Sequence, residues 1–233
     1  TEPAGLPVRI ERYVAHRRRL VPEPFRDLGR TPLVAIALPH GSYRVVVEAP
    51  GGTIYLPVRL ERGGHVQPAG PDGRPRVVPV PRPGDLDQDD IFIPGGWCWL
   101  GGDPSAIGSR PRRRVYVDDV IIRRHPVTNG EYVAFLDDLV HQGRVDEALR
   151  HVPREKGGTV GQVGAMIYGR HPDGTFFLRP DADGDEWGPD QPAVMITWHG
   201  AVAYADWLAA RTDRPWRLPT SDEWEKAGRG ADE

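Results

Sequence analysis

The chain has 233 residues and a formal net charge of −3, with 30 Lys and Arg against 33 Asp and Glu. Nucleic-acid-binding proteins usually carry a basic excess, so this balance argues against that class. No segment approaches the roughly 18 apolar residues of a membrane span, and residues 1–20 contain no apolar signal-peptide core. We therefore predict a cytoplasmic protein without a membrane or nucleic-acid partner.

The 28 glycines and 25 prolines predict short elements joined by long loops. Residues 1–29 are rich in arginine and interrupted by proline, which indicates a linker, and residues 8–20 within it are a candidate short helix or strand. Three apolar runs then alternate with period two, in residues 34–38, 43–47 and 54–60. This pattern predicts a small antiparallel β-module with one buried face. Residues 63–90 form its linker, with one candidate strand at 77–80, so the module and linker occupy 30–90 and a domain boundary is expected near residue 90.

The β-module resembles the small bacterial β-domains of the PEGA and carboxypeptidase-regulatory-like type. Residues 29–33 and 38–45 carry the resemblance. Such modules usually have no catalytic chemistry, and this stretch contains neither paired carboxylates nor a histidine cluster. A PEGA-like module without a catalytic site is therefore expected here.

The second half predicts a mixture of strands and helices. Residues 91–99 and 115–122 are apolar strand candidates, and residues 176–178 are a shorter one. Thr128 stands three residues before Glu131, which fits a capping box at the start of a helix. Residues 145–151 predict a second short helix and residues 201–208 a third. Another capping box, Thr220 with Glu223, predicts a last helix that ends near Gly228.

Tryptophan is concentrated near the end of the chain. Five of the seven tryptophans lie between residues 187 and 224, and Trp97 and Trp99 lie on the first apolar run of the second half. Aromatic side chains at this density usually pack a core, so we expect a loop-rich domain with tryptophans inside it.

Three blocks of the second half resemble the sulfatase-modifying-factor family, also called the formylglycine-generating-enzyme domain. They are residues 93–102, residues 117–135 with the run Pro126-Val127-Thr128-Asn129-Gly130-Glu131-Tyr132, and residues 191–227 with the run Arg217-Leu218-Pro219-Thr220-Ser221-Asp222-Glu223-Trp224. The resemblance covers about residues 91–230. It implies an α+β, C-type-lectin-like, loop-rich domain over 91–233. The positions expected to carry the family signature in a structural role are Thr128, Asn129, Tyr132, Trp198, Trp207, Arg217, Leu218, Pro219, Thr220, Glu223 and Trp224.

The resemblance also implies what this chain lacks. In the family's enzymes the copper-binding cysteine pair and the calcium loops follow the block that matches Arg217 to Trp224. We therefore expect a domain truncated in its C-terminal half, with no catalytic, cofactor-binding or metal-binding residue of its own. Copper and calcium are expected only if that half is supplied. The single cysteine, Cys98, cannot provide a two-thiolate Cu(I) site and is expected to be a buried, inert thiol.

Other candidate sites are weaker. Asp181 to Asp185 resembles the start of a calcium loop, but Glu186 and Pro192 stand where an EF-hand needs Gly and Glu, so a solvated turn is expected. The eight histidines form no H-x-x-x-H pair, and His199 is expected to cap a helix or face solvent. The basic cluster Arg110, Arg112, Arg113 and Arg114 suits either a charged strand edge or an acidic partner.

These observations favour a non-catalytic binding or structural portion of a sulfatase-modifying-factor-like domain within a larger modular bacterial protein. Two alternatives stay open. One is a fragment of a copper-dependent formylglycine-generating oxidase, and the other is a regulatory appendage of a serine/threonine kinase. An incomplete domain would expose apolar surface, so we also expect a second polypeptide, a missing segment or a dimer partner to complete its core.

Overall fold

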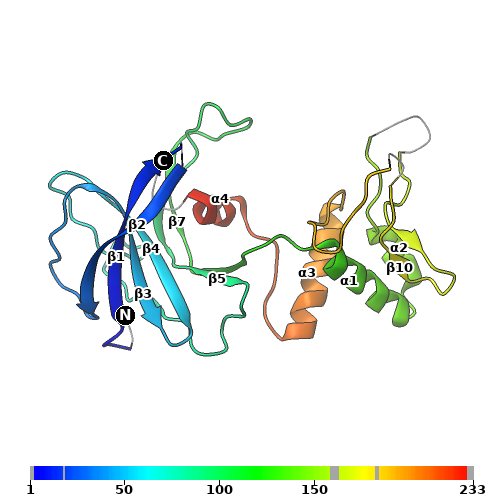
Figure 1. The fold of residues 1–233 in the computed structure, drawn as a ribbon, viewed down its shortest axis with the longest axis horizontal. Helices are drawn as coiled ribbons and strands as arrows, with labels where there is room; N and C mark the ends of the chain where they lie inside the picture. The colour runs from blue at the N-terminus through cyan, green and yellow to red at the C-terminus, as the bar shows by residue number, and fades with distance from the viewer. Residues whose placement is uncertain (1–2, 18, 158–162, 182–183, 230–233) are drawn as a thin grey trace. The chain divides into compact units, whose positions relative to one another are not determined.

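The computed structural model describes residues 3–17, 19–157, 163–181 and 184–229. Contacts between residues divide the chain into two units (Figure 1). The sheet unit comprises residues 1–124 together with 219–233, and the helical unit comprises residues 125–218. In the part of the chain that is described, no helix is both long enough and apolar enough to cross a bilayer.

A four-stranded antiparallel sheet begins the sheet unit, drawn from blue to cyan in Figure 1. Its strands are β1 (Pro7–His16), β2 (Arg19–Arg30), β3 (Gly41–Ala49) and β4 (Gly52–Leu60), in the order β2-β1-β3-β4. Alternate residues of β1, β3 and β4 bury one face, because strand side chains point to opposite sides of the sheet. The core beneath them contains Val8, Val47, Ile54 and Phe92.

Residues 7–16 and 19–30 form β1 and β2, so the linker expected at residues 1–29 is wrong for them. The candidate element at residues 8–20 is a strand as far as His16. The prolines at 22 and 24 and the many arginines favoured the linker interpretation. Proline cannot donate to a strand ladder, but β2 is an edge strand with a neighbour on one side only. Conversely, residues 34–38 form no strand, and Val34 is 82% exposed. β1 occupies the place beside β3, and the Ala37 carbonyl of this run accepts a hydrogen bond from the Arg26 side chain of β2 at 2.9 Å.

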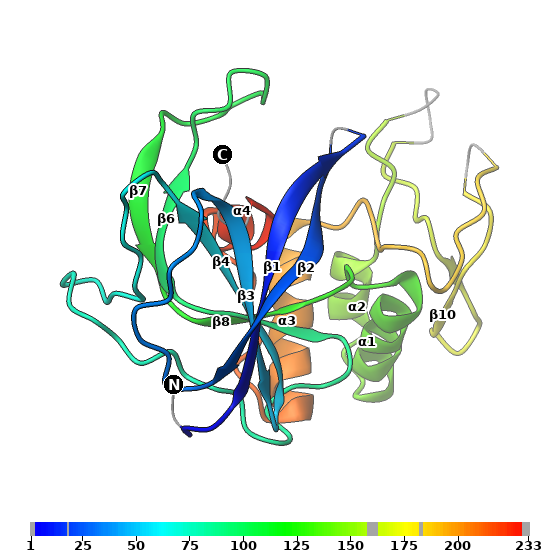
Figure 2. The ribbon, with the colours of Figure 1, turned by 60° about the vertical axis from the view of Figure 1, so that its left-hand side comes forward.

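Two short antiparallel pairs follow in the same unit. β5 (Asp90–Ile93) pairs with β8 (Val120–Arg123). β6 (Gly96–Leu100) pairs with β7 (Arg113–Val117), and these two strands lie side by side in Figure 2. The strands expected at 91–99 and 115–122 are thus confirmed. Helix α4 (Ser221–Arg229) lies against β6 and β7.

Residues 61–89 contain no regular strand, including the expected one at 77–80. Nevertheless Val78 is buried, and Val80 and Leu86 pack against the core of the sheet. These contacts tie the segment and β5 to the sheet, so the contact-defined units do not divide near residue 90.

The helical unit contains α1 (Asn129–His141), α2 (Val145–His151), α3 (Trp198–Thr212) and a two-residue pair, β9 (Gly169–Arg170) with β10 (Phe176–Phe177). Its core is aromatic, and Tyr132, Phe135, Tyr168, Phe176 and Tyr204 are all at least 95% buried. The helices expected at 145–151 and 201–208 are confirmed, although Gly228 lies inside α4 and does not end it. The whole chain is mixed α and β with small antiparallel sheets, in agreement with the expected class.

Candidate functional site

Three signature residues of the helical unit stand at the start of α1. The Thr128 side chain accepts a hydrogen bond from the Glu131 N–H, and the Glu131 carboxylate accepts one from the Thr128 N–H, which completes the expected capping box. Asn129 is 1% exposed and donates to the Gly188 carbonyl at 3.0 Å, while its own oxygen accepts from the Tyr168 hydroxyl at 2.7 Å. All these groups stabilise the loop around α1, so they act inside the fold.

Tyr132 and Trp207 join the helices of this unit. The Tyr132 hydroxyl donates to the carbonyl of His151, the last residue of α2, at 3.0 Å. Burial raises the pKa of this phenol far above its ordinary value, so it stays protonated as a donor. Trp207 donates from Nε1 to Asp138 on α1 at 2.7 Å. Trp198, by contrast, is 67% exposed, so the expectation of buried tryptophans fails there.

The remaining signature residues surround the start of α4. Thr220 and Glu223 exchange hydrogen bonds in a second capping box, and Arg217 donates to the Leu218 carbonyl at 3.1 Å. Pro219 opens the segment that returns to the sheet unit, directly after Leu218. Trp224 is 64% exposed. The signature residues therefore do not converge on one pocket within the described structure of either unit.

Sequence reasoning missed Lys226, which is central to the sheet unit. Its Nζ donates to the carbonyl oxygens of Pro94 at 2.7 Å, Val117 at 3.2 Å and Gly96 at 3.5 Å. Burial lowers the pKa of this amine, because desolvation disfavours its charge. The sequence held one signal, since Lys226 lies four residues after Asp222 and so on the same helical face. Asp222 forms an ion pair with Arg113 of β7.

Cys98 lies on β6 and interacts electrostatically with Lys226, Asp222 and Glu225 of α4. Its thiol lies 3.6 Å from the Val115 carbonyl oxygen, and burial raises its pKa. The residue is partly exposed rather than fully buried. A raised pKa makes the thiolate scarce, which agrees with an inert thiol. Because the sequence holds one cysteine, the donor set of these 233 residues does not fit a two-thiolate copper centre.

The opposite face of the β6–β7 pair carries alternating rings and cations. Arg112 stacks over Trp99 at 4.5 Å and Arg114 over Trp97 at 5.0 Å. Trp97 and Trp99 are 38% and 49% exposed. We call these four residues the Trp/Arg face. Together they form an exposed surface whose chemistry suits an acidic, partly apolar partner.

A cavity of about 510 Å³ lies at the junction of α2 and α3. Its lining consists of Arg150, His151, Thr197 and His199, and we call it the α2–α3 pocket. Thr197 caps α3 by accepting the Gly200 N–H at 3.0 Å. His199 is exposed at the first turn of α3, as expected, and lies 5.2 Å from the ring of Trp198.

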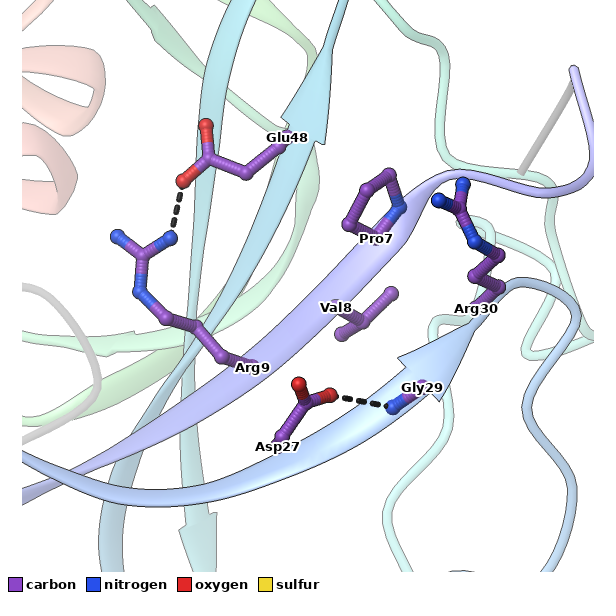
Figure 3. A pocket seen from close by; sticks show the side chains of 7 residues that line it. All are labelled: Pro7, Val8, Arg9, Asp27, Gly29, Arg30 and Glu48. Atoms are coloured by element: carbon purple, nitrogen blue, oxygen red, sulfur yellow. Dashed lines mark hydrogen bonds and ion pairs between the residues drawn. The ribbon is translucent and has the colours of Figure 1, made fainter.

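A smaller groove, of about 290 Å³, crosses β1, β2 and β3 (Figure 3). Its charged side chains form ion pairs and hydrogen bonds with neighbouring residues of the same unit. Arg9 forms an ion pair with Glu48, Asp27 accepts the Gly29 N–H at 2.7 Å, and Arg30 donates to the Gly5 carbonyl at 2.6 Å. These bonds stabilise the sheet, so the groove is a weaker site than the α2–α3 pocket.

The acidic segment near residue 181 behaves as a turn in its described part. The Asp181 carboxylate accepts from the Asp185 N–H at 2.9 Å and from Trp187 Nε1 at 3.0 Å. Asp183 lies outside the described residues. Among the residues described, no cluster of three or more His, Cys, Asp or Glu side chains could hold a metal ion.

Comparison with known proteins identifies the second half of the chain. A family model described as the sulfatase-modifying factor enzyme 1-like domain matches residues 76–233. A formylglycine-generating enzyme of Thermomonospora curvata is 31% identical over 168 residues, which cover 66% of this chain and 52% of the relative. A hercynine oxygenase of Mycolicibacterium smegmatis is 34% identical over 160 residues, or 64% of this chain and 33% of the relative. A serine/threonine-protein kinase pkn1 of Chlamydia caviae is 26% identical, and the match covers 20% of its length. The chain thus spans about half, or less, of these relatives.

Proposed function

This chain belongs to the sulfatase-modifying factor enzyme 1-like family, and on that premise we propose that it is a non-catalytic scaffold and recognition portion of such a domain within a larger modular protein. One observation carries the proposal. The signature side chains of Thr128, Asn129, Tyr132, Thr220 and Glu223 are engaged in caps and internal hydrogen bonds. Groups committed to holding helices and loops are not available for a reaction. The proposal includes a C-type-lectin-like arrangement for residues 91–233 and a PEGA-like identity for the β-module.

The test uses the natural protein that carries this sequence, supplied with oxygen, copper and a cysteine-containing peptide. Mass spectrometry then follows oxidation of the peptide. We expect Cys98→Ser to leave any oxidation rate unchanged, and the 233-residue chain by itself to produce no oxidised peptide. Loss of the reaction on replacing Cys98, with the fold retained by circular dichroism, would contradict a non-catalytic role.

A second candidate function is the enzyme portion of an oxidising protein. It is favoured by the alignments with a formylglycine-generating enzyme and a hercynine oxygenase, at 31% and 34% identity. Under this alternative the natural protein oxidises a cysteine peptide or hercynine, and residues 76–233 support residues elsewhere. The kinase-named relative, at 26% identity, supports a regulatory appendage more weakly. Phosphorylation of a general substrate by the natural protein would separate that alternative from the other two.

The proposed scaffold role includes a partner at the Trp/Arg face. An acidic segment of another polypeptide suits this surface, because Arg112 and Arg114 are held beside two exposed indoles. Hydroxyl-radical footprinting of the natural protein, compared with the 233-residue chain, tests this. We expect oxidation of Trp97 and Trp99 to fall severalfold in the natural protein. Oxidation of partly buried Trp207 serves as the internal reference, and equal labelling of Trp97 and Trp99 in both samples would exclude a partner at this face.

A further inference from the structure

We propose that the α2–α3 pocket binds a small oxyanion, a carboxylate or a phosphate monoester, through Arg150, His151 and His199. This inference is independent of the scaffold role, and its failure would leave that role untouched. The pocket lies wholly within the helical unit and contains none of the signature residues.

The lining groups suit an anion. Arg150 contributes a permanent positive charge with several donors, and His199 contributes an imidazole from the first turn of α3. Among the described residues, no carboxylate lines the pocket. The acid next to it, Glu147, is held by Arg144 through two hydrogen bonds of 2.7 and 2.8 Å. That ion pair offsets part of the charge of Glu147, and Arg150 stays available to attract a ligand.

His151 supplies the observation that points to a missing partner. Its Nδ1 is buried and has no hydrogen-bond partner within the described part of the chain. Its other nitrogen lies 4.0 Å from Glu147 Oε1, beyond hydrogen-bond distance. The ring is packed against Phe135, with 6.0 Å between ring centroids. Buried polar atoms are nearly always satisfied. Nδ1 is covered in this ring orientation, so a turn of the His151 ring into the pocket that it lines would bring the unpaired nitrogen to a ligand oxygen.

The electrostatic field at His151 also favours an anion. Burial lowers the pKa of this imidazole, and the positive groups Arg150, His199 and Arg144 lower it further, while Glu147 opposes them. A bound anion would reverse the effect of those cations and raise the pKa. Binding would then be coupled to proton uptake, and affinity would increase as the pH falls.

The size of the cavity defines the class of ligand further. A volume of about 510 Å³ is larger than a bare ion requires. The volume leaves room for an organic part beside the charged groups. The pocket therefore fits a small organic acid or a phosphate monoester.

Imidazole NMR of the 15N-labelled 233-residue chain tests the site, with inorganic phosphate and acetate as separate probes. Chloride at matched ionic strength is the reference. We expect saturable shifts of His151 and His199 at about pH 6 and weaker binding at about pH 8. Shifts with acetate alone would assign a carboxylate ligand, and shifts with phosphate alone would assign a phosphate ligand. Shifts of the same size with chloride, or none with either probe, would overturn the proposal.

Variants of exposed residues separate binding from folding. Arg150→Gln and His199→Gln should each weaken binding about tenfold, because each removes a charge-assisted hydrogen bond. The matched controls Arg124→Gln and His65→Gln change the same residue types in the sheet unit. They should bind as the parent does. Equal loss in the pocket variants and the controls would show non-specific charge screening and would refute the site.

Discussion

Lys226 shows how a single side chain can join backbone segments that are distant in sequence. Its amine bonds to carbonyls of residues 94, 96 and 117, more than one hundred residues earlier. A buried ammonium is tolerated only when hydrogen bonds replace its hydration. Lys226 therefore acts as a tie between α4 and the ends of β6 and β7, and its contribution is structural.

Replacing Lys226 with Met should destabilise the protein by about 3 kcal/mol, since buried carbonyls lose their donor while the volume is kept. Urea denaturation would show the loss as a lower midpoint. The chain offers a matched control, because Lys156 is the other of its two lysines, is exposed, and donates to the Ile196 carbonyl at 3.3 Å. Lys156→Met should cost less than about 0.5 kcal/mol. Equal midpoints for the two variants would contradict the tie.

His151 should make stability depend on pH. Burial lowers its pKa below the ordinary value of 6.5, so below that pH the unfolded chain binds more protons than the native one. The free energy of unfolding should therefore fall as the pH drops from about 6.5 towards the native pKa. Thermal unfolding in chloride buffers measures this slope. His151→Gln should flatten it and His65→Gln should not, and an unchanged slope in His151→Gln would assign the effect to other groups.

Among the secondary-structure elements, helices α1 and α4 begin where hydrogen bonds between residues close in sequence cap them. Thr128 and Thr220 each cap a helix with a glutamate three residues later, and both caps were evident from spacing alone. Helix α2 differs, since its N-cap, Arg144, makes no side-chain cap bond. Its position is set instead by Ala148, which is fully buried, and by the bond from Tyr132 to its last carbonyl. Tertiary contacts thus hold the element that carries half of the α2–α3 pocket.

Loss of either cap should cost a similar amount. Thr128→Ala and Thr220→Ala are each expected to lower the free energy of unfolding by about 1 kcal/mol, because one N–H at the helix start loses its acceptor. Thr→Ser at the same positions keeps the hydroxyl and should recover most of the loss. Chemical denaturation of the four variants measures this, and alanine variants as stable as the serine variants would show that the caps contribute nothing.

At the scale of the whole molecule, the chain leaves the sheet unit after residue 124 and returns to it at residue 219. The returning segment brings α4, in which Lys226 donates to backbone carbonyls, Asp222 forms an ion pair with Arg113, and Glu225 accepts the Gly101 N–H at 2.6 Å. The folding of β6 and β7 therefore depends on residues that follow the entire helical unit.

A chain ended at Leu218 should show this dependence in hydrogen exchange. The amides of β6 and β7 should exchange at least tenfold faster, because the bonds from α4 are gone. Amides of α1 and α3 belong to the helical unit and should keep their protection. Unchanged exchange in β6 and β7 would show that these strands are stable without α4.

Features that depend on neighbours a few residues away were predictable from the order of the amino acids. Both capping boxes, the bounds of α2 and the strands near residues 91–99 and 115–122 followed from local pattern, and the family followed from the resemblance of three sequence blocks. Tertiary structure decided the rest. Residues 19–30 form a strand despite Pro22 and Pro24 because they occupy a sheet edge, and residues 7–16 form a strand between β2 and β3. Residues 34–38 form none, and β1 rather than this run lies beside β3. Lys226, the Trp/Arg face and the α2–α3 pocket each bring together residues far apart in the chain. Spacing along a sequence constrains local hydrogen bonds, whereas the contacts at these three places exist only once the chain has folded.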